Sequence, residues 1–140
     1  MFDGLHGHDG NTRARIVALA RSYLGVPYRW GGRTRRGMDG TGFVSVVYAS
    51  ALPDRRARFM ALDAESLMDG GLFEPVAEPL PGDLVLFPQD QHTPAHVAIV
   101  VDGDGFIGAQ SATGVALASY RRGWWAERPV RLFRRCAELA

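Results

Sequence analysis

The spacing of hydrophobic and polar positions changes near the middle of the chain. In the first part, apolar residues from Ile16 to Leu24 recur at the spacing of one helical face. Asn11 or Thr12 is the expected N-cap of this helix, and Gly25 follows its last apolar residue. The pattern therefore predicts a helix over about residues 12–24.

Two further helices are predicted before the change in spacing. One spans residues 41–51, has Asp39 just before it and carries a mainly apolar sequence. The other is shorter and spans residues 61–68. Residues 26–37, between the first two helices, are rich in glycine and arginine and are expected to form a loop.

The second half of the chain has the short apolar runs that are typical of strands. These runs are residues 83–87, 96–101, 106–109, 115–118 and 130–133. The sequence Asp102-Gly-Asp-Gly105 predicts a hairpin turn between two of them. Helices followed by antiparallel strands indicate an α+β fold, with N-terminal helices packed on a central antiparallel sheet. We expect residues 1–11 to form a flexible arm and residues 12–140 to form a single domain.

Composition narrows the class of protein. The chain has 140 residues, 46% of them apolar, and its 16 basic and 15 acidic residues leave a formal net charge of +1. This balance indicates no nucleic-acid partner. No apolar run is long enough for a membrane span, and no Sec-type signal peptide is visible, so the localisation stays open. The single cysteine, Cys136, excludes disulfides within the chain and zinc sites built on several thiolates.

Two patterns that resemble metal sites have simpler interpretations. His92 and His96 are four residues apart, as in a helical metal pair, but Pro94 lies between them in a strand-like sequence. Asp102 and Asp104 resemble the start of a calcium loop, but no glutamate closes it. We therefore predict no metal and no other cofactor.

Five short motifs follow one another in a fixed order. The chain reads LGVPYRWGG from Leu24, DGTGF from Asp39, PGDLVLF from Pro81, HVAIVV from His96 and FIGAQSATGV from Phe106. In this order and spacing they resemble the NlpC/P60 family of cell-wall cysteine peptidases, over about residues 12–133. The resemblance implies a papain-like α+β fold and a bacterial hydrolase acting at the cell wall. The family cuts peptidoglycan stem peptides, typically between D-glutamate and a diamino acid.

The resemblance also implies where a catalytic group would lie. In such a site a cysteine at a helix N-terminus forms the thiolate, a histidine on a strand takes the proton, and a third polar residue orients the ring. The general base would be His96, and the third polar position is occupied by Gly108. Gln110 could orient the ring instead, because residues two apart share one face of a strand.

The nucleophile position implied by the resemblance holds Gly40, where the family has cysteine. Glycine has no side chain, so no thiolate and no covalent intermediate can form there. Thr41 would point about 100° around the helix, and Cys136 is remote in sequence. We therefore predict that the chain is catalytically inactive as written.

Four positions are candidates for substrate binding. Asp39 matches the family's carboxylate for the substrate amino group, although a helix N-cap is an alternative and both roles are compatible. Tyr28 and Trp30 would line the groove, with core packing as the alternative. Arg33 belongs to a group of loop arginines that suggests an anionic ligand, or simply a solvated loop. That group is Arg29, Arg33, Arg35 and Arg36.

Three hypotheses about function follow. The first is a pseudoenzyme that binds a peptidoglycan stem peptide or a related peptide. The second is an inactivated form of an active D-glutamyl-diamino acid endopeptidase, with Gly40 replacing the cysteine; we favour a natural change, since an engineer would choose alanine or serine. The third is a structural or interaction module of a phage tail or secreted assembly. A protein partner is possible, with Trp124-Trp125 and Arg134-Arg135 as a contact surface, although an aromatic pair near a chain end is more often a lid on the core.

Overall fold

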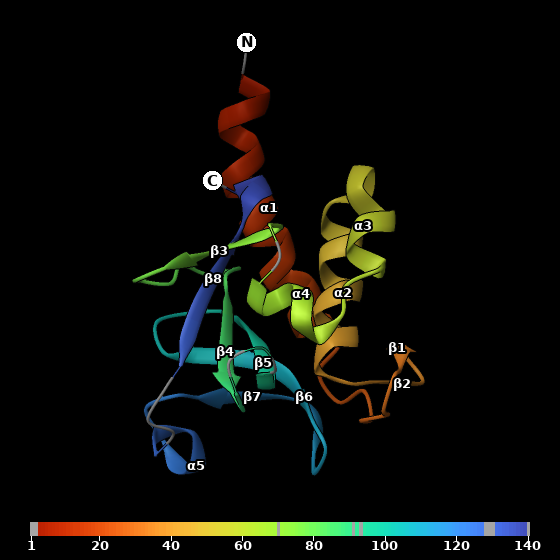
Figure 1. The fold of residues 1–140 in the computed structure, drawn as a ribbon. Helices are drawn as coiled ribbons and strands as arrows, with labels where there is room; N and C mark the ends of the chain where they lie inside the picture. Colours follow the sequence, from red (N-terminus) through yellow and green to blue (C-terminus); the bar gives the residue numbers. More distant parts are fainter. Residues whose placement is uncertain (1–2, 70, 91, 93, 128–130, 140) are drawn as a thin grey trace.

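The computed structural model describes residues 3–69, 71–90, 92, 94–127 and 131–139 (Figure 1). The helical segments are α1 (Asp3–Ser22), α2 (Gly40–Ala51), η1 (Pro53–Arg55), α3 (Arg56–Met60), α4 (Ala64–Asp69), α5 (Gly123–Ala126) and η2 (Ala137–Leu139). The strands are β1 (Arg33–Thr34), β2 (Gly37–Met38), β3 (Phe73–Val76), β4 (Leu84–Pro88), β5 (Pro94–Val100), β6 (Gly105–Gln110), β7 (Gly114–Ser119) and β8 (Leu132–Cys136). None of the helices described is long and apolar enough to cross a lipid bilayer.

The main sheet has six strands in the order β3-β8-β4-β5-β6-β7, and each neighbouring pair is antiparallel. Strands β4 to β7 follow one another along the chain as hairpins, with residues 102–104 forming the turn between β5 and β6. Strand β8 returns from the end of the chain to lie between β3 and β4. A separate short hairpin, β1-β2, precedes α2.

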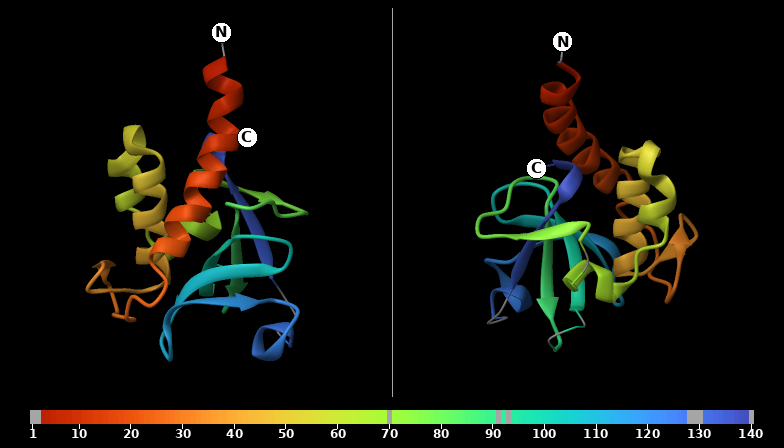
Figure 2. Two further views of the ribbon diagram at one scale, coloured as in Figure 1. Left: turned by 180° about the vertical axis from the view of Figure 1, so that it is seen from behind. Right: turned by 45° about the horizontal axis from the view of Figure 1, so that its top comes forward.

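The two faces of the sheet bury different side chains. On β5, Val97 and Ile99 face a large core shared with α1 and α2, whereas Ala98 and Val100 belong to a second, smaller cluster. This alternation is the period of two expected of a strand that is buried on both faces. Figures 1 and 2 show α1 and α2 beside the sheet, with α5 at the far end of it.

The α+β arrangement is confirmed, with helices packed on an antiparallel sheet. The first helix starts earlier than expected: α1 runs from Asp3, so residues 3–11 of the predicted arm are helical, and neither Asn11 nor Thr12 is an N-cap. Once a helix is nucleated, each added residue gains a hydrogen bond, so the sequence alone does not set the first turn. In Figure 2 this N-terminal part of α1 projects beyond the remainder of the fold.

Two other boundaries differ from the expectation. The helix predicted over residues 61–68 corresponds to α4, which begins three residues later, at Ala64, while α3 was not predicted and ends before residue 61. The last strand is β8, shifted toward the C-terminus relative to the predicted 130–133. Residue 130 lies outside the described residues. Strand β3 was not predicted, because its sequence FEPV has no strand pattern and its pairing with β8 is a long-range contact.

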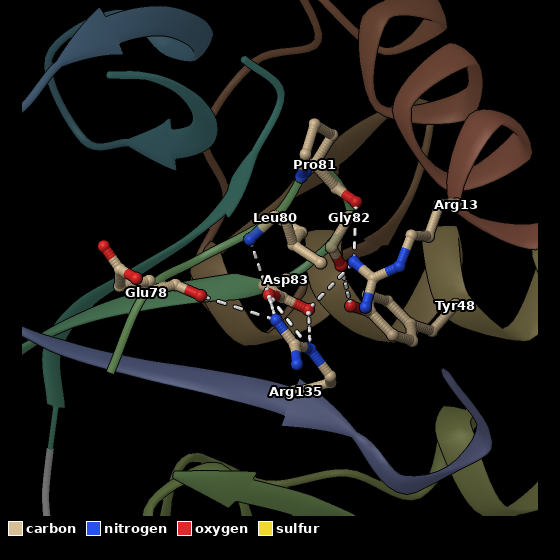
Figure 3. Close-up of polar contacts among 8 residues, drawn as sticks. All are labelled: Arg13, Tyr48, Glu78, Leu80, Pro81, Gly82, Asp83 and Arg135. Carbon is tan, nitrogen blue, oxygen red and sulfur yellow. Dashed lines mark hydrogen bonds and ion pairs between the residues drawn. The ribbon is translucent and has the colours of Figure 1, made fainter. Parts of the chain in front are cut away.

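A buried carboxylate ties the start of β4 to two other elements (Figure 3). Asp83 is fully buried and accepts hydrogen bonds from Arg13 of α1 at 3.1 Å and from Arg135 of β8 at 2.9 Å. The backbone N–H of Leu80 donates to the same carboxylate at 2.8 Å. Next to it, the Tyr48 hydroxyl of α2 donates to the carbonyl of Gly82. The PGD motif therefore fixes α1, α2 and β8 around one turn, which holds α2 in place against the sheet.

Candidate active site

The N-terminus of α2 is fixed by Asp39. This residue has extended backbone angles, φ −94° and ψ −176°, and its Oδ1 accepts a hydrogen bond from the Gly42 N–H at 2.7 Å. Its Oδ2 accepts from the Gly31 N–H at 2.8 Å. The N-cap expected from the sequence is therefore confirmed, and the same carboxylate also ties the preceding loop to the helix.

The loop and the helix approach too closely for a side chain at Gly42. A Cβ at this position would overlap the carbonyl oxygen of Gly32. The Asp39 N–H also donates to that carbonyl, at 3.3 Å. The glycine after the DGT sequence is therefore required by packing, and it lets residues 30–32 lie directly beside the first turn of α2.

Gly40 is the first residue of α2, and it faces β5. A Cβ placed on Gly40 would lie 3.2 Å from Cγ1 of Val97 and 3.5 Å from the Val97 carbonyl oxygen. Val97 directly follows His96 in the strand. The backbone of β5 therefore lies beside Gly40, but the His96 ring is on the other face of the strand, with Phe87 and Phe106, because successive side chains of a strand alternate.

The ring of His96 lies among aromatic side chains. It stacks on Trp125 of α5, with 4.6 Å between ring centroids and 28° between planes. Phe87 of β4, which is paired with His96, and Phe106 of β6 lie at 6.3 Å and 6.4 Å. Burial lowers the pKa of His96 from 6.5 to about 4, since the charged form loses its hydration. The imidazole is therefore neutral at pH 7.

Neither candidate for the third polar residue bonds to the far ring nitrogen. Nε2 of His96 is buried and has no hydrogen-bond partner among the described residues. A Cβ on Gly108 would lie 2.9 Å from this atom and 2.8 Å from the Ala98 Cβ, so the ring already occupies the space beside Gly108. Gln110, at the end of β6, is half-buried, and its side chain does not reach Nε2.

The two aromatic residues of the loop differ in burial. Tyr28 forms an isolated bridge with Met38 and packs against the main core, so it is partly a structural residue. Trp30 is 86% exposed, which makes the core-packing alternative wrong for this residue. The Asp39–Gly31 bond ties the loop that carries this exposed tryptophan to the N-terminus of α2, and the indole is available to contact a ligand.

Arg33 has a structural role that the sequence did not reveal. Its Nη1 donates to the Ser45 hydroxyl at 2.6 Å and to the Met60 carbonyl at 2.9 Å, and its Nη2 donates to the Leu62 carbonyl at 2.6 Å. These bonds join the β1-β2 hairpin to α2 and the end of α3. Arg35 instead lies over the Tyr23 ring, 4.1 Å from its centroid. The guanidinium of Arg33 is thus largely engaged within the protein.

Cys136 does not supply a substitute nucleophile. It lies at the end of β8, where it pairs with Phe73, and it is fully buried. Burial raises the pKa of its thiol to about 12, so the thiol stays protonated at neutral pH. Among the described residues, no three histidine, cysteine, aspartate or glutamate side chains gather as metal ligands would.

The arrangement is that of a papain-like domain, with a capped helix N-terminus set beside a histidine-bearing strand. The sequence profile of the NlpC/P60 family matches residues 25–134, and the chain belongs to this family. It is 36% identical over 109 residues to the probable endopeptidase NlpC of Escherichia coli K12, an alignment covering 75% of this chain and 66% of that protein. It is 29% identical over 115 residues to LytE, a probable peptidoglycan endopeptidase of Bacillus subtilis.

That alignment covers 82% of this chain but only 32% of LytE, so the chain spans about a third of the length of this relative. Among solved structures, the NlpC/p60 domain of the peptidoglycan hydrolase SagA superposes with a TM-score of 0.67 and 29% identity, covering 87% of this chain and 96% of that one. The peptidoglycan hydrolase RipB of Mycobacterium tuberculosis has the same fold, with a TM-score of 0.69 at 20% identity, over 94% of this chain and 70% of that one. The chain is therefore an NlpC/P60 peptidoglycan hydrolase-like domain.

Sequence reasoning missed two residues that shape the site. In the sequence Trp125 is only half of an aromatic pair near the chain end, and its stacking on His96 follows from the position of α5, which no local pattern predicts. Asp83 was read only as part of a motif. Asp83 stands directly before the apolar run LVLF. An acid at the start of such a strand is a signal that its carboxylate is buried and paired.

Proposed function

We propose that this domain binds a peptidoglycan stem peptide, or a peptide of related chemistry, and does not cleave it. The observation that carries the proposal is Gly40 at the capped N-terminus of α2, next to the strand of His96. A Cys–His peptidase needs a thiolate at this place, and here no side chain is present to form a covalent intermediate.

The state of His96 supports the same proposal. A working Cys–His pair requires an imidazole that can take up a proton near neutral pH. Burial lowers the pKa of His96 to about 4, and its Nε2 has no partner among the described residues. Both the nucleophile and the base therefore depart from what hydrolysis needs.

The features that would bind a peptide are retained. Trp30 is exposed on a loop that is fixed beside the helix N-terminus. Each carboxylate oxygen of Asp39 accepts one backbone N–H, and each has a second lone pair that can accept a hydrogen bond from a substrate amino group. An aromatic wall next to a carboxylate suits the amino end of a stem peptide.

Two assays test the proposal. In a muropeptide hydrolysis assay, we expect no turnover above that of His96→Ala, and turnover above this control would overturn the claim of inactivity. In a titration with soluble stem peptide, we expect saturable binding that weakens in Trp30→Ala, with Trp124→Ala as the matched control. A folded protein that gives no saturable signal at millimolar peptide would overturn the binding claim.

A second candidate, an endopeptidase inactivated at position 40, is supported by the space around Gly40. The tightest contact of an added Cβ would be 3.2 Å to a methyl group of Val97, which a small rotation of that side chain relieves. If this candidate is right, Gly40→Cys gains activity that His96→Ala abolishes, while Gly40→Ala stays inert. A folded Gly40→Cys protein without activity favours the binding domain.

A further inference from the structure

The imidazole of His96 is held by rings rather than by hydrogen bonds. Trp125 covers one face of it, with the planes only 28° apart, and Phe87 and Phe106 complete the surround from β4 and β6. The described side chains packed on the ring from these three elements are uncharged. In a Cys–His site, by contrast, the ring is oriented by a polar residue bonded to its far nitrogen.

Within the part of the chain that the structure describes, no side chain makes that bond. Position 108 is glycine, and a Cβ there would lie 2.9 Å from Nε2, which is closer than a carbon and a nitrogen normally pack. A side chain at position 108 and the observed place of the ring therefore exclude each other. The ring occupies the place that an orienting side chain would need.

The helix that carries Trp125 is anchored independently of His96. Tyr120, just before it, stacks on Phe106 with 6.1 Å between centroids and 4° between planes. The Tyr120 hydroxyl donates to the Gly103 carbonyl at 2.6 Å, and Arg131 donates to the Tyr120 carbonyl at 2.8 Å. The indole of Trp125 is thus presented by a fixed segment and not by a free loop.

We propose that Trp125 is the positioning residue for the His96 imidazole, and that its stacking replaces the hydrogen bond of a third polar residue. Because stacking takes the place of the hydrogen bond, the His96 ring can be ordered although position 108 is glycine. It also implies that restoring a polar side chain at position 108 displaces the ring from Trp125. The inference rests on the proposed site at Gly40 and His96, but it does not depend on peptide binding.

The test is the titration of His96 followed by NMR, with the signal assigned from a His96→Gln variant. In the wild type the ring is expected to titrate near pH 4 and to show upfield ring-current shifts from the indole. Trp125→Leu admits water to one face of the His96 ring, which stabilises the charged form. The acid dissociation constant of His96 should therefore fall by at least about tenfold, which is a rise of about one pKa unit. Trp125→Phe should restore the wild-type value to within about threefold.

The control is Leu117→Ala, at a side chain of β7 that has 55% of its surface accessible. It should leave the His96 titration near the wild-type value. A folded Trp125→Leu protein with unchanged pKa and ring shifts would overturn the inference. If that variant does not fold, the wild type still decides: no nuclear Overhauser contact between the Trp125 indole and the His96 ring would overturn it. Neither result bears on peptide affinity, so the two proposals fail separately.

Discussion

His96 shows how one residue can keep its place in a site and change its chemistry. The strand motif that carries His96 is intact. His96 directly precedes Val97, the residue that lies against Gly40. Its surroundings, however, are the rings of Phe87, Phe106 and Trp125. The sequence predicts the position of the histidine, whereas its protonation depends on side chains from three separate elements.

The buried histidine makes the stability of the domain depend on pH. The pKa of His96 is about 4 in the folded state and near 6.5 when unfolded, so between these values the unfolded chain binds more protons. This contribution to stability is complete above about pH 6.5 and is lost as the pH falls through 4, by up to about 3 kcal/mol. Urea unfolding from pH 7 to pH 4 measures it. His96→Gln should lose less stability over this range, and equal losses in the two proteins would contradict the prediction.

At the scale of elements, α2 is the best-predicted part of the fold. Its observed bounds, Gly40–Ala51, differ from the predicted 41–51 by one residue, because Asp39 is a strong local start signal. The strands of the hairpins from β4 to β7 were also predicted, since their apolar runs are separated by turn residues. Strand β3 was not predicted, because its long-range pairing with β8 decides it, and helix α3 was not predicted either.

The double role of Asp39 predicts a measurable loss when the carboxylate is removed. Asp39→Ala removes the N-cap of α2 and also frees the Gly31 N–H. We expect the free energy of unfolding to fall by about 1–2 kcal/mol, as seen for lost N-caps. Asp39→Asn keeps acceptor capacity at the cap and should lose less. Asp54→Ala, at an exposed acid of η1, is the control, and an Asp39→Ala protein as stable as this control would contradict the prediction.

At the scale of the whole molecule, the sheet order could not be predicted from the sequence. Strand β8 inserts between β3 and β4, and it brings Arg135 to a carboxylate that also binds Arg13, 122 positions earlier in the numbering. The order of helices and strands predicted the α+β class, but the ion pairs between Asp83 and the two arginines depend on the three-dimensional fold. The same holds for Arg33, whose bonds to α2 and α3 give it a structural role.

The Asp83 cluster is the point at which a single charge change should affect the entire fold. Asp83→Asn leaves Arg13 and Arg135 without their shared anion, and both arginines are largely buried. Breaking a buried ion pair from one side typically costs about 3–5 kcal/mol. We expect the free energy of unfolding, measured by urea denaturation, to fall by about this amount. Glu74→Gln, at an exposed residue of β3, is the control. A midpoint equal to that of the control would contradict the prediction.

The burial of Cys136 has a practical consequence for studying the domain. A thiol that is fully buried and protonated does not react with maleimides or disulfide reagents until the structure opens. In the Gly40→Cys protein, a short exposure to such a reagent should therefore label position 40 selectively, with no need to remove the native cysteine. A fluorophore placed there would report directly on what binds beside the N-terminus of α2, and slow labelling of Cys136 would report global opening in the same sample.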